Sequence, residues 1–219
     1  MKDITGLFLG LKNNKYLIEC VGSYFLVLAY GISGDALAIG FMLSALIYIG
    51  AVTSGAHYNP AISFGAFLLK RISGVEFLVY VLAQIIGAFL AASTILMFSG
   101  AVFYVEPPIG STFYQQVGVE ALFSIILVLV AFVAWIGKSA NKIPSAYAVI
   151  MGFALIALVT IGQGLSGAFF NPAISISTSI LDFSLQGSSY VFVPIYTIAP
   201  LFGASLAVLI YKYLIEEAE

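Results

Sequence analysis

Charged residues are scarce in this sequence. The 219-residue chain has 8 Lys and Arg residues and 10 Asp and Glu residues, which together make up 8% of it. An ordinary soluble domain is about 25% charged, so this chain has too few charges to cover a surface that faces water. The net charge of −2 and the lack of a basic block argue against a nucleic-acid partner, because such a partner needs a dense positive surface.

Cysteine and histidine are almost absent as well. Cys20 is the single cysteine and His57 the single histidine, so no disulfide can form within the chain. His57 could act as a pH gate or a metal ligand, but a lone histidine without partner ligands at a suitable spacing makes a poor metal site. A positioning role is the favoured interpretation. Since no activated nucleophile and no phosphate-binding loop is visible, we expect no cofactor, no metal ion and no catalytic activity.

Apolar runs, in contrast, are long, and 62% of the residues are hydrophobic. A helix needs about 20 residues to cross about 30 Å of hydrocarbon. Six segments approach that length, namely residues 16–34, 36–56, 75–98, 115–137, 145–164 and 190–213. Two shorter segments, 60–69 and 172–181, can cross only about half of the membrane. The sequence therefore predicts an all-α integral membrane protein, surrounded by lipid, with six transmembrane helices and two half-helices.

The basic residues indicate how the chain is oriented, because Lys and Arg in short loops remain on the cytoplasmic side. With six spans and a cytoplasmic N-terminus, every basic residue falls on one side: Lys2, Lys12, Lys15, Lys70, Arg71, Lys138, Lys142 and Lys212. The opposite loops carry only the acidic residues Asp35, Glu106 and Asp182. We expect both termini in the cytoplasm and the protein in the plasma membrane. Asp182 also opposes the dipole at the end of the second half-helix, for which the sequence offers no reason.

One ten-residue pattern occurs twice. Ser-Gly-Ala, two variable residues and Asn-Pro-Ala-Ile-Ser run over 54–63 and again over 166–175. Glu19 and Glu120 take equivalent places in the first and fourth spans. Each half has three spans, an odd number, so the second half is inserted upside down, as in transport proteins with a central site. We predict a single channel domain over 1–219, built of inverted repeats at about 16–98 and 115–213.

The repeated pattern predicts a pore. Asn is a favoured N-cap and Pro suits the first helical turn, so the two triplets should begin the half-helices near the midplane: Asn59, Pro60 and Ala61, then Asn171, Pro172 and Ala173. Irregular backbone at that depth is tolerated where it lines a watery cavity. Two facing helix N-termini place about one positive charge there, which repels cations and protons. Backbone carbonyls should line the rest of the pore, from Gly55, Ala56, His57, Gly167, Ala168 and Phe169.

These features together resemble the aquaporin, or major intrinsic protein, family over nearly the whole chain. The resemblance rests on the two Asn-Pro-Ala boxes, the Ser-Gly-Ala before each, and the intramembrane Glu19 and Glu120. It implies a right-handed bundle of six tilted helices plus two half-helices, one pore per subunit and a homotetramer. Glu19 and Glu120 could form a proton relay, but the resemblance favours acceptance of hydrogen bonds from the irregular backbone before each half-helix.

The sequence departs from the family at the outer constriction. Four positions form this selectivity filter in most members, and by spacing they fall on Ile39, Val159, Ala168 and Ile174, all apolar. Ile174 replaces the usual Arg, and Ser175 replaces the Asp usual in glycerol channels. We expect a passive channel for water or other small uncharged solutes. Two alternatives remain: a channel mainly for ammonia, gases, hydrogen peroxide or small neutral organic molecules, and a structural membrane protein with a closed pore.

Overall fold

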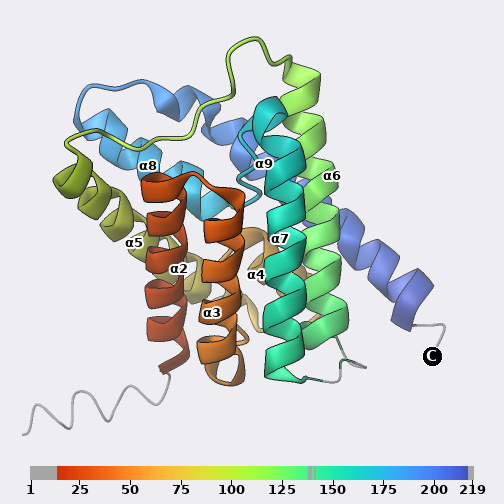
Figure 1. The fold of residues 1–219 in the computed structure, drawn as a ribbon. Coiled ribbons are helices and arrows are strands. Elements are labelled where there is room, and N and C mark those ends of the chain that lie inside the picture. Colours follow the sequence, from red (N-terminus) through yellow and green to blue (C-terminus); the bar gives the residue numbers. More distant parts are fainter. Residues whose placement is uncertain (1–13, 138–139, 141, 217–219) are drawn as a thin grey trace, which may run out of the picture.

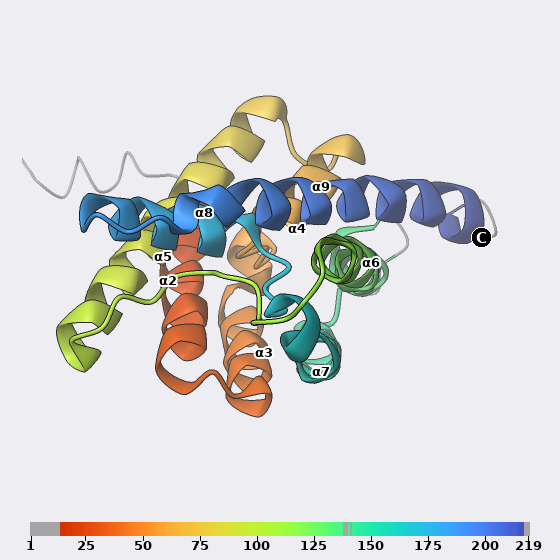
Figure 2. The same cartoon turned by 90° about the horizontal axis from the view of Figure 1, so that it is seen from above.

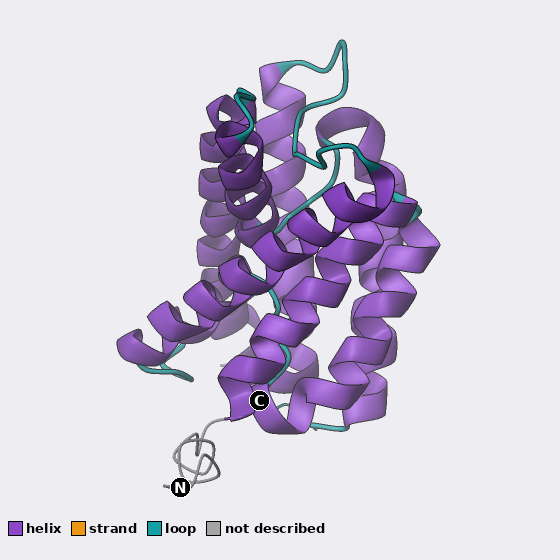
Figure 3. Ribbon diagram, turned by 90° about the vertical axis from the view of Figure 1, so that its left-hand side faces the viewer, coloured by secondary structure: helices purple, strands orange, loops and turns teal. Residues whose placement is uncertain are grey.

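The computed structural model describes residues 14–137, 140 and 142–216, and these ranges are helical and free of strands (Figure 3). Six helices are long and apolar enough to cross a membrane, which confirms the predicted number of spans. They are α2 (Asn14–Ser33), α3 (Ala36–Ser54), α5 (Gly74–Ser99), α6 (Phe113–Ala131), α7 (Pro144–Ser166) and α9 (Val193–Ile210).

Two shorter helices follow the Asn-Pro pairs, as the capping pattern predicts. They are α4 (Pro60–Leu68) and α8 (Pro172–Ser184), and Figure 1 shows α4 in the lower half of the molecule and α8 in the upper half. Asn59 and Asn171 have extended backbones, and each side-chain oxygen accepts the N–H of the residue two positions on. This bond satisfies one of the free N–H groups of the first turn. The second half-helix ends three residues later than predicted.

Two of the spans do not continue as regular α-helices to their ends. The π turn η1 (Phe132–Ile136) extends α6, a 3-10 turn η2 (Ser189–Phe192) precedes α9, and the π turn η3 (Tyr211–Glu216) follows it. Hydrophobicity alone cannot distinguish these turns from an α-helix, because each turn continues the apolar run of its span. The spans are also strongly tilted against one another: in Figure 2 α6 and α7 are seen end-on, while α9 runs across the view.

Glycines set the closest helix contacts. A Cβ atom on Gly87 of α5 would lie 2.0 Å from the backbone oxygen of Cys20 in α2, and one on Gly203 of α9 would lie 2.3 Å from that of Ala121 in α6. Cys20 and Ala121 directly follow the two intramembrane glutamates, so the same crossing occurs in each half of the chain. Small residues at such crossings let membrane helices approach closely.

Asp182 lies inside α8 rather than in the outer loop where the sequence analysis placed it. Its buried carboxylate accepts the backbone N–H of Ser189, the first residue of η2, at 2.9 Å. The negative charge therefore stabilises the N-terminal end of the next helical segment, which accounts for a charge that opposes the dipole of its own helix. Lys2, Lys12 and Lys138 lie outside the described residues.

Candidate pore

The first half-helix is held in place by a fully buried carboxylate. Glu19 accepts four hydrogen bonds: from the Ser54 hydroxyl at 2.7 Å, from the backbone N–H groups of His57 and Tyr58 at 2.9 and 2.7 Å, and from Gln84 Nε2 at 2.8 Å. The carboxylate thus anchors the irregular segment that leads into α4.

Glu120 repeats this arrangement in the second half. It accepts the Ser166 hydroxyl at 2.8 Å and the N–H groups of Phe169 and Phe170 at 3.1 and 2.8 Å. Pro200 stands where the first half has Gln84, so this carboxylate lacks the corresponding donor.

The anchored segments have strained backbones. Ala56, Tyr58, Ala168 and Phe170 all have φ between 51° and 59°, a left-handed conformation that costs a residue other than glycine about 1–3 kcal/mol. Hydrogen bonds to the two glutamates offset this cost, because the carboxylates hold the N–H groups of these segments in the required directions. The geometry supports the anchoring role for Glu19 and Glu120 over a proton relay, because the glutamate is the acceptor in every described hydrogen bond.

The two asparagines meet at the centre of the molecule. Asn59 Nδ2 donates to the backbone oxygen of Phe170 at 2.8 Å, and Asn171 Nδ2 donates to that of Tyr58 at 2.9 Å. Each bond therefore crosses from one repeat to the residue before the other asparagine. An amide nitrogen carries two hydrogens, so each asparagine retains one donor for a solute.

His57 belongs to a hydrogen-bonded chain with Ser63 and Gln84. Its Nδ1 lies 3.0 Å from Ser63 Oγ, and Gln84 Nε2 donates to that same oxygen at 2.9 Å as well as to Glu19. Ser63 and Gln84 thus link the His57 ring to Glu19 through side-chain hydrogen bonds.

A small cavity lies between the two asparagines. About 20 Å³ of it is open to a water-sized molecule, and a site needs about 10–15 Å³ to hold one water. Four of the lining residues have polar side chains: Tyr30, His57, Asn59 and Asn171. The others, all apolar, are Leu26, Leu43, Ile62, Leu127, Met151, Leu155 and Phe169. Lys, Arg, Asp and Glu are missing from this lining, as far as the described residues define it.

The four positions expected to form the filter are buried but do not line this cavity. Ile39, Val159, Ala168 and Ile174 expose 2% of their surface or less. Among the six residues expected to contribute pore carbonyls, His57 and Phe169 line the cavity. The backbone oxygen of Ala168 accepts the Tyr30 hydroxyl at 3.3 Å, so the carbonyl expected to face the solute already has a partner.

Comparisons with known proteins agree with this geometry. The family model described as major intrinsic protein matches residues 8–211. The chain belongs to this family. Aquaporin AqpM from Methanothermobacter marburgensis is 30% identical over 190 residues, covering 83% of this chain and 76% of that protein. Glycerol uptake facilitator protein-like 6 from Lactiplantibacillus plantarum is 30% identical over 208 residues, covering 88% and 94%.

The fold agrees as well. The crystal structure of the aquaglyceroporin from Plasmodium falciparum superposes with a TM-score of 0.83 at 20% identity, and covers 94% of this chain and 97% of its own. This major intrinsic protein is therefore an aquaporin-like helical bundle. It is a passive membrane channel for water or small neutral solutes and not an enzyme.

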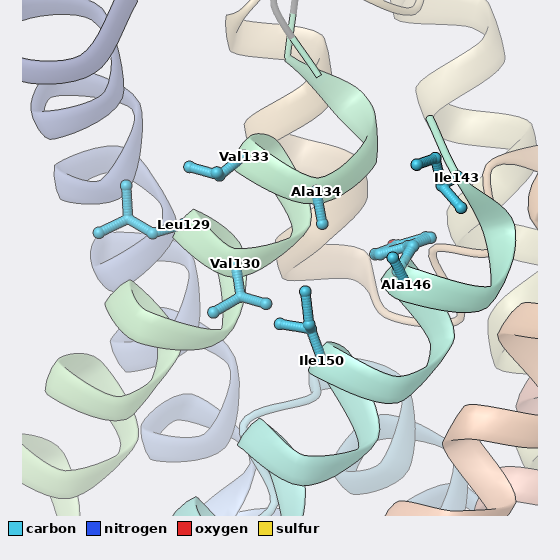
Figure 4. Close-up of a pocket in the computed structure, with 8 residues that line it drawn as sticks. Leu129, Val130, Val133, Ala134, Ile143, Ala146 and Ile150 are labelled. Carbon is cyan, nitrogen blue, oxygen red and sulfur yellow. The ribbon is translucent and has the colours of Figure 1, made fainter. Parts of the chain in front are cut away.

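A second hollow of this major intrinsic protein lies apart from its pore. A groove of about 430 Å³ runs between the end of α6, η1 and the start of α7, where Figure 4 shows its apolar side chains facing a common space. Val133, Ile143 and Ile150 on its walls are about half exposed. The groove thus opens on the outer surface of the bundle, away from the asparagines.

Two tyrosines that support the pore escaped the sequence analysis. Tyr80 donates its hydroxyl to the backbone oxygen of Ser54 at 2.6 Å, and Tyr196 donates to that of Ser166. Each tyrosine precedes the matched Gln84 or Pro200 by four residues. A comparison of the two repeats one helical turn before Gln84 and Pro200 could have revealed this pair.

Proposed function

We propose that this channel passes water-sized neutral solutes in single file between Asn59 and Asn171. The observation that carries the proposal is the central cavity of about 20 Å³, which suits one water molecule. Four polar side chains approach it, so a passing solute can replace some of its hydrogen bonds at that point. Glycerol is much larger than this space, and Ser175 occupies the place where glycerol channels usually have Asp.

The charge at the centre opposes ions. The N-termini of α4 and α8 each carry about half a positive charge, and the cavity lining holds no acidic side chain in the described residues. A cation that enters such a space loses its hydration without compensation, which costs many kcal/mol. The remaining amide hydrogens of Asn59 and Asn171 hold the oxygen of a central water and turn its hydrogens away, which interrupts a proton wire.

The proposal also includes an outer constriction that favours less polar solutes. Ile39, Val159, Ala168 and Ile174 offer no polar side-chain atom, and a hydrophobic neck can lose its water. Water should therefore pass slowly, and small solutes with weaker hydration, such as ammonia, should pass comparatively well. The two named relatives are called an aquaporin and a glycerol facilitator, so their names do not decide between water and glycerol, and the small central cavity is what argues against glycerol here.

Assembly and location complete the proposal. We place the protein in the plasma membrane as a homotetramer, with one pore in each subunit and both termini in the cytoplasm. Many large apolar side chains cover the outside of the bundle, among them Met97 at 80% and Val52 at 78% exposure. Such a surface needs lipid or neighbouring subunits to cover it.

Stopped-flow light scattering on proteoliposomes tests the transport proposal. Vesicles with the protein should shrink in an osmotic gradient faster than empty vesicles, while glycerol entry stays at the level of empty vesicles. Ammonia entry, followed by an internal pH dye, should exceed that of empty vesicles by a larger factor than water does. Water and ammonia rates equal to those of empty vesicles would contradict the proposal and favour a closed pore.

A further inference from the structure

We infer that Tyr30 is a specificity-determining residue that sets the largest solute this pore admits. Tyr30 lies in α2, is 6% exposed and lines the central cavity beside Phe169. Neither the comparison of the two sequence repeats nor the set of expected filter positions points to Tyr30. The inference rests on the proposed pore and adds the residue that limits its width.

The Tyr30 ring is fixed at both ends. Its hydroxyl donates to the backbone oxygen of Ala168 at 3.3 Å, and its ring lies 5.6 Å from the ring of Phe169 with the planes 33° apart. These contacts join α2 to the segment before α8, 138 residues away. A ring held by a hydrogen bond and a neighbouring aromatic ring cannot turn aside easily when a solute arrives.

Phe169 is itself held by its surroundings. The Tyr196 ring meets it edge-on at 5.6 Å, Phe103 lies 6.4 Å away, and its backbone N–H is bound to Glu120. Tyr30 and Phe169 therefore form a braced aromatic pair on the side of the cavity that leads to Ala168. Because Ala168 is one of the filter positions, this pair adjoins the expected outer constriction.

The inverted repeat shows that the fold does not need a large residue here. The spacing that relates Glu19 to Glu120 relates Tyr30 to Ala131, and the spacing that relates Asn59 to Asn171 relates Phe169 to His57. At the equivalent position the second half thus carries a methyl group in place of a phenol. The bulk of Tyr30 is a feature of one end of the pore rather than of the bundle.

The chemistry of Tyr30 suits the gap that the missing arginine leaves. Ile174 supplies no donor, whereas the Tyr30 hydroxyl can exchange its Ala168 bond for one to a small solute. The solutes that fit are single-centre hydrides such as water and ammonia. Branched polar solutes such as urea and glycerol need the space that the ring occupies.

Three variants of Tyr30, purified and reconstituted, test the inference by light scattering with urea, glycerol and water. Tyr30→Leu and Tyr30→Ala should raise urea and glycerol permeability about tenfold, which equals a barrier lowered by about 1.4 kcal/mol, without reducing water flux. Tyr30→Phe keeps the ring and should still exclude glycerol. Tyr24→Leu is the matched control, because Tyr24 is on the same helix and its hydroxyl is bonded to Thr94 at 3.2 Å, outside the cavity lining.

Two results would overturn the inference. The first is wild-type urea and glycerol permeability in both the Leu and Ala variants while water still passes. The second is loss of all flux in both variants while Tyr24→Leu conducts, since Tyr30 would then be needed for folding. A wild-type protein that fails to conduct water contradicts the proposed function instead, and the urea and glycerol measurements still decide the role of Tyr30.

Discussion

At the scale of single residues, this channel departs from the usual family pattern at position 174, where Ile replaces the expected Arg. Ile174 lies in the first turn of α8, fully buried, with its N–H bonded to the backbone oxygen of Asn171 at 3.1 Å. The backbone of the second box is therefore ordinary for a half-helix. Only the side chain differs, and it brings neither the positive charge nor the donors that an arginine would bring.

Ile174→Arg should make the pore more selective for water. A guanidinium group adds donors to an apolar neck, and each new hydrogen bond is worth about 1 kcal/mol, so the ratio of water to ammonia permeability should rise roughly fivefold. Ile174→Met, a long side chain without donors, is the control and should leave the ratio near that of the wild type. Equal ratios in all three proteins would show that position 174 is not part of the constriction.

At the scale of helices, the fold depends on two equivalent crossings in which a glycine of one helix touches the backbone of another. Gly87 against Cys20 and Gly203 against Ala121 bring α5 to α2 and α9 to α6 next to the buried glutamates. A change at either crossing moves the helix that carries a glutamate. The irregular segments before α4 and α8 would move with it, because their N–H groups are bound to these carboxylates.

Gly87→Ala should destabilise the bundle. The added methyl group would lie 2.0 Å from the backbone oxygen of Cys20, and such overpacking costs about 1–3 kcal/mol. Gly164→Ala in α7 is the control, because a Cβ there meets nothing within 4 Å, and alanine raises helix stability by about 1 kcal/mol over glycine. Thermal unfolding in detergent should show a lower transition for the first variant only. A transition equal to that of the wild type would show that α2 and α5 can separate at no cost.

The sequence predicts the helices better than the contacts between them. Span lengths follow from apolar runs, and the starts of α4 and α8 follow from the Asn-Pro pairs, because both depend on neighbouring residues. The bond from Tyr30 to Ala168 depends on two residues 138 positions apart, and no local pattern marks it. The π turns also escape prediction, since the same apolar composition fits either kind of helix.

The candidate site, like the fold, can be predicted from the sequence only in part. The repeated pattern marks Asn59, Asn171 and the two glutamates, because the repeat preserves them in both halves. It cannot mark Tyr30, whose counterpart in the second half is Ala131. Repetition therefore reveals the parts of the pore that the fold requires in duplicate, and it conceals the parts that make one end different from the other.

At the scale of the whole molecule, the chain places its charges unevenly. Of the described basic residues, Lys70, Arg71 and Lys142 lie in connections on the side where α2 begins, while the loop that holds Glu106 lies at the opposite end (Figure 1). Basic loops remain in the cytoplasm during insertion. We therefore expect the orientation that agrees with these charges, with the half-helix α4 entering from the inside and α8 from the outside.

Labelling of introduced cysteines can test this orientation, because the chain has a single native cysteine, Cys20, which lies within the span α2. Ile109 is fully exposed in the loop after α5, and Lys142 is exposed in the connection before α7. In a Cys20→Ser background, a membrane-impermeant maleimide should label Ile109→Cys in intact cells and Lys142→Cys only after the cells are opened. The background protein alone should remain unlabelled. The reverse pattern would place the basic loops outside the cell. The half-helix α4, rather than α8, would then enter from the outer side, and the aromatic pair of Tyr30 and Phe169 would face the cytoplasm.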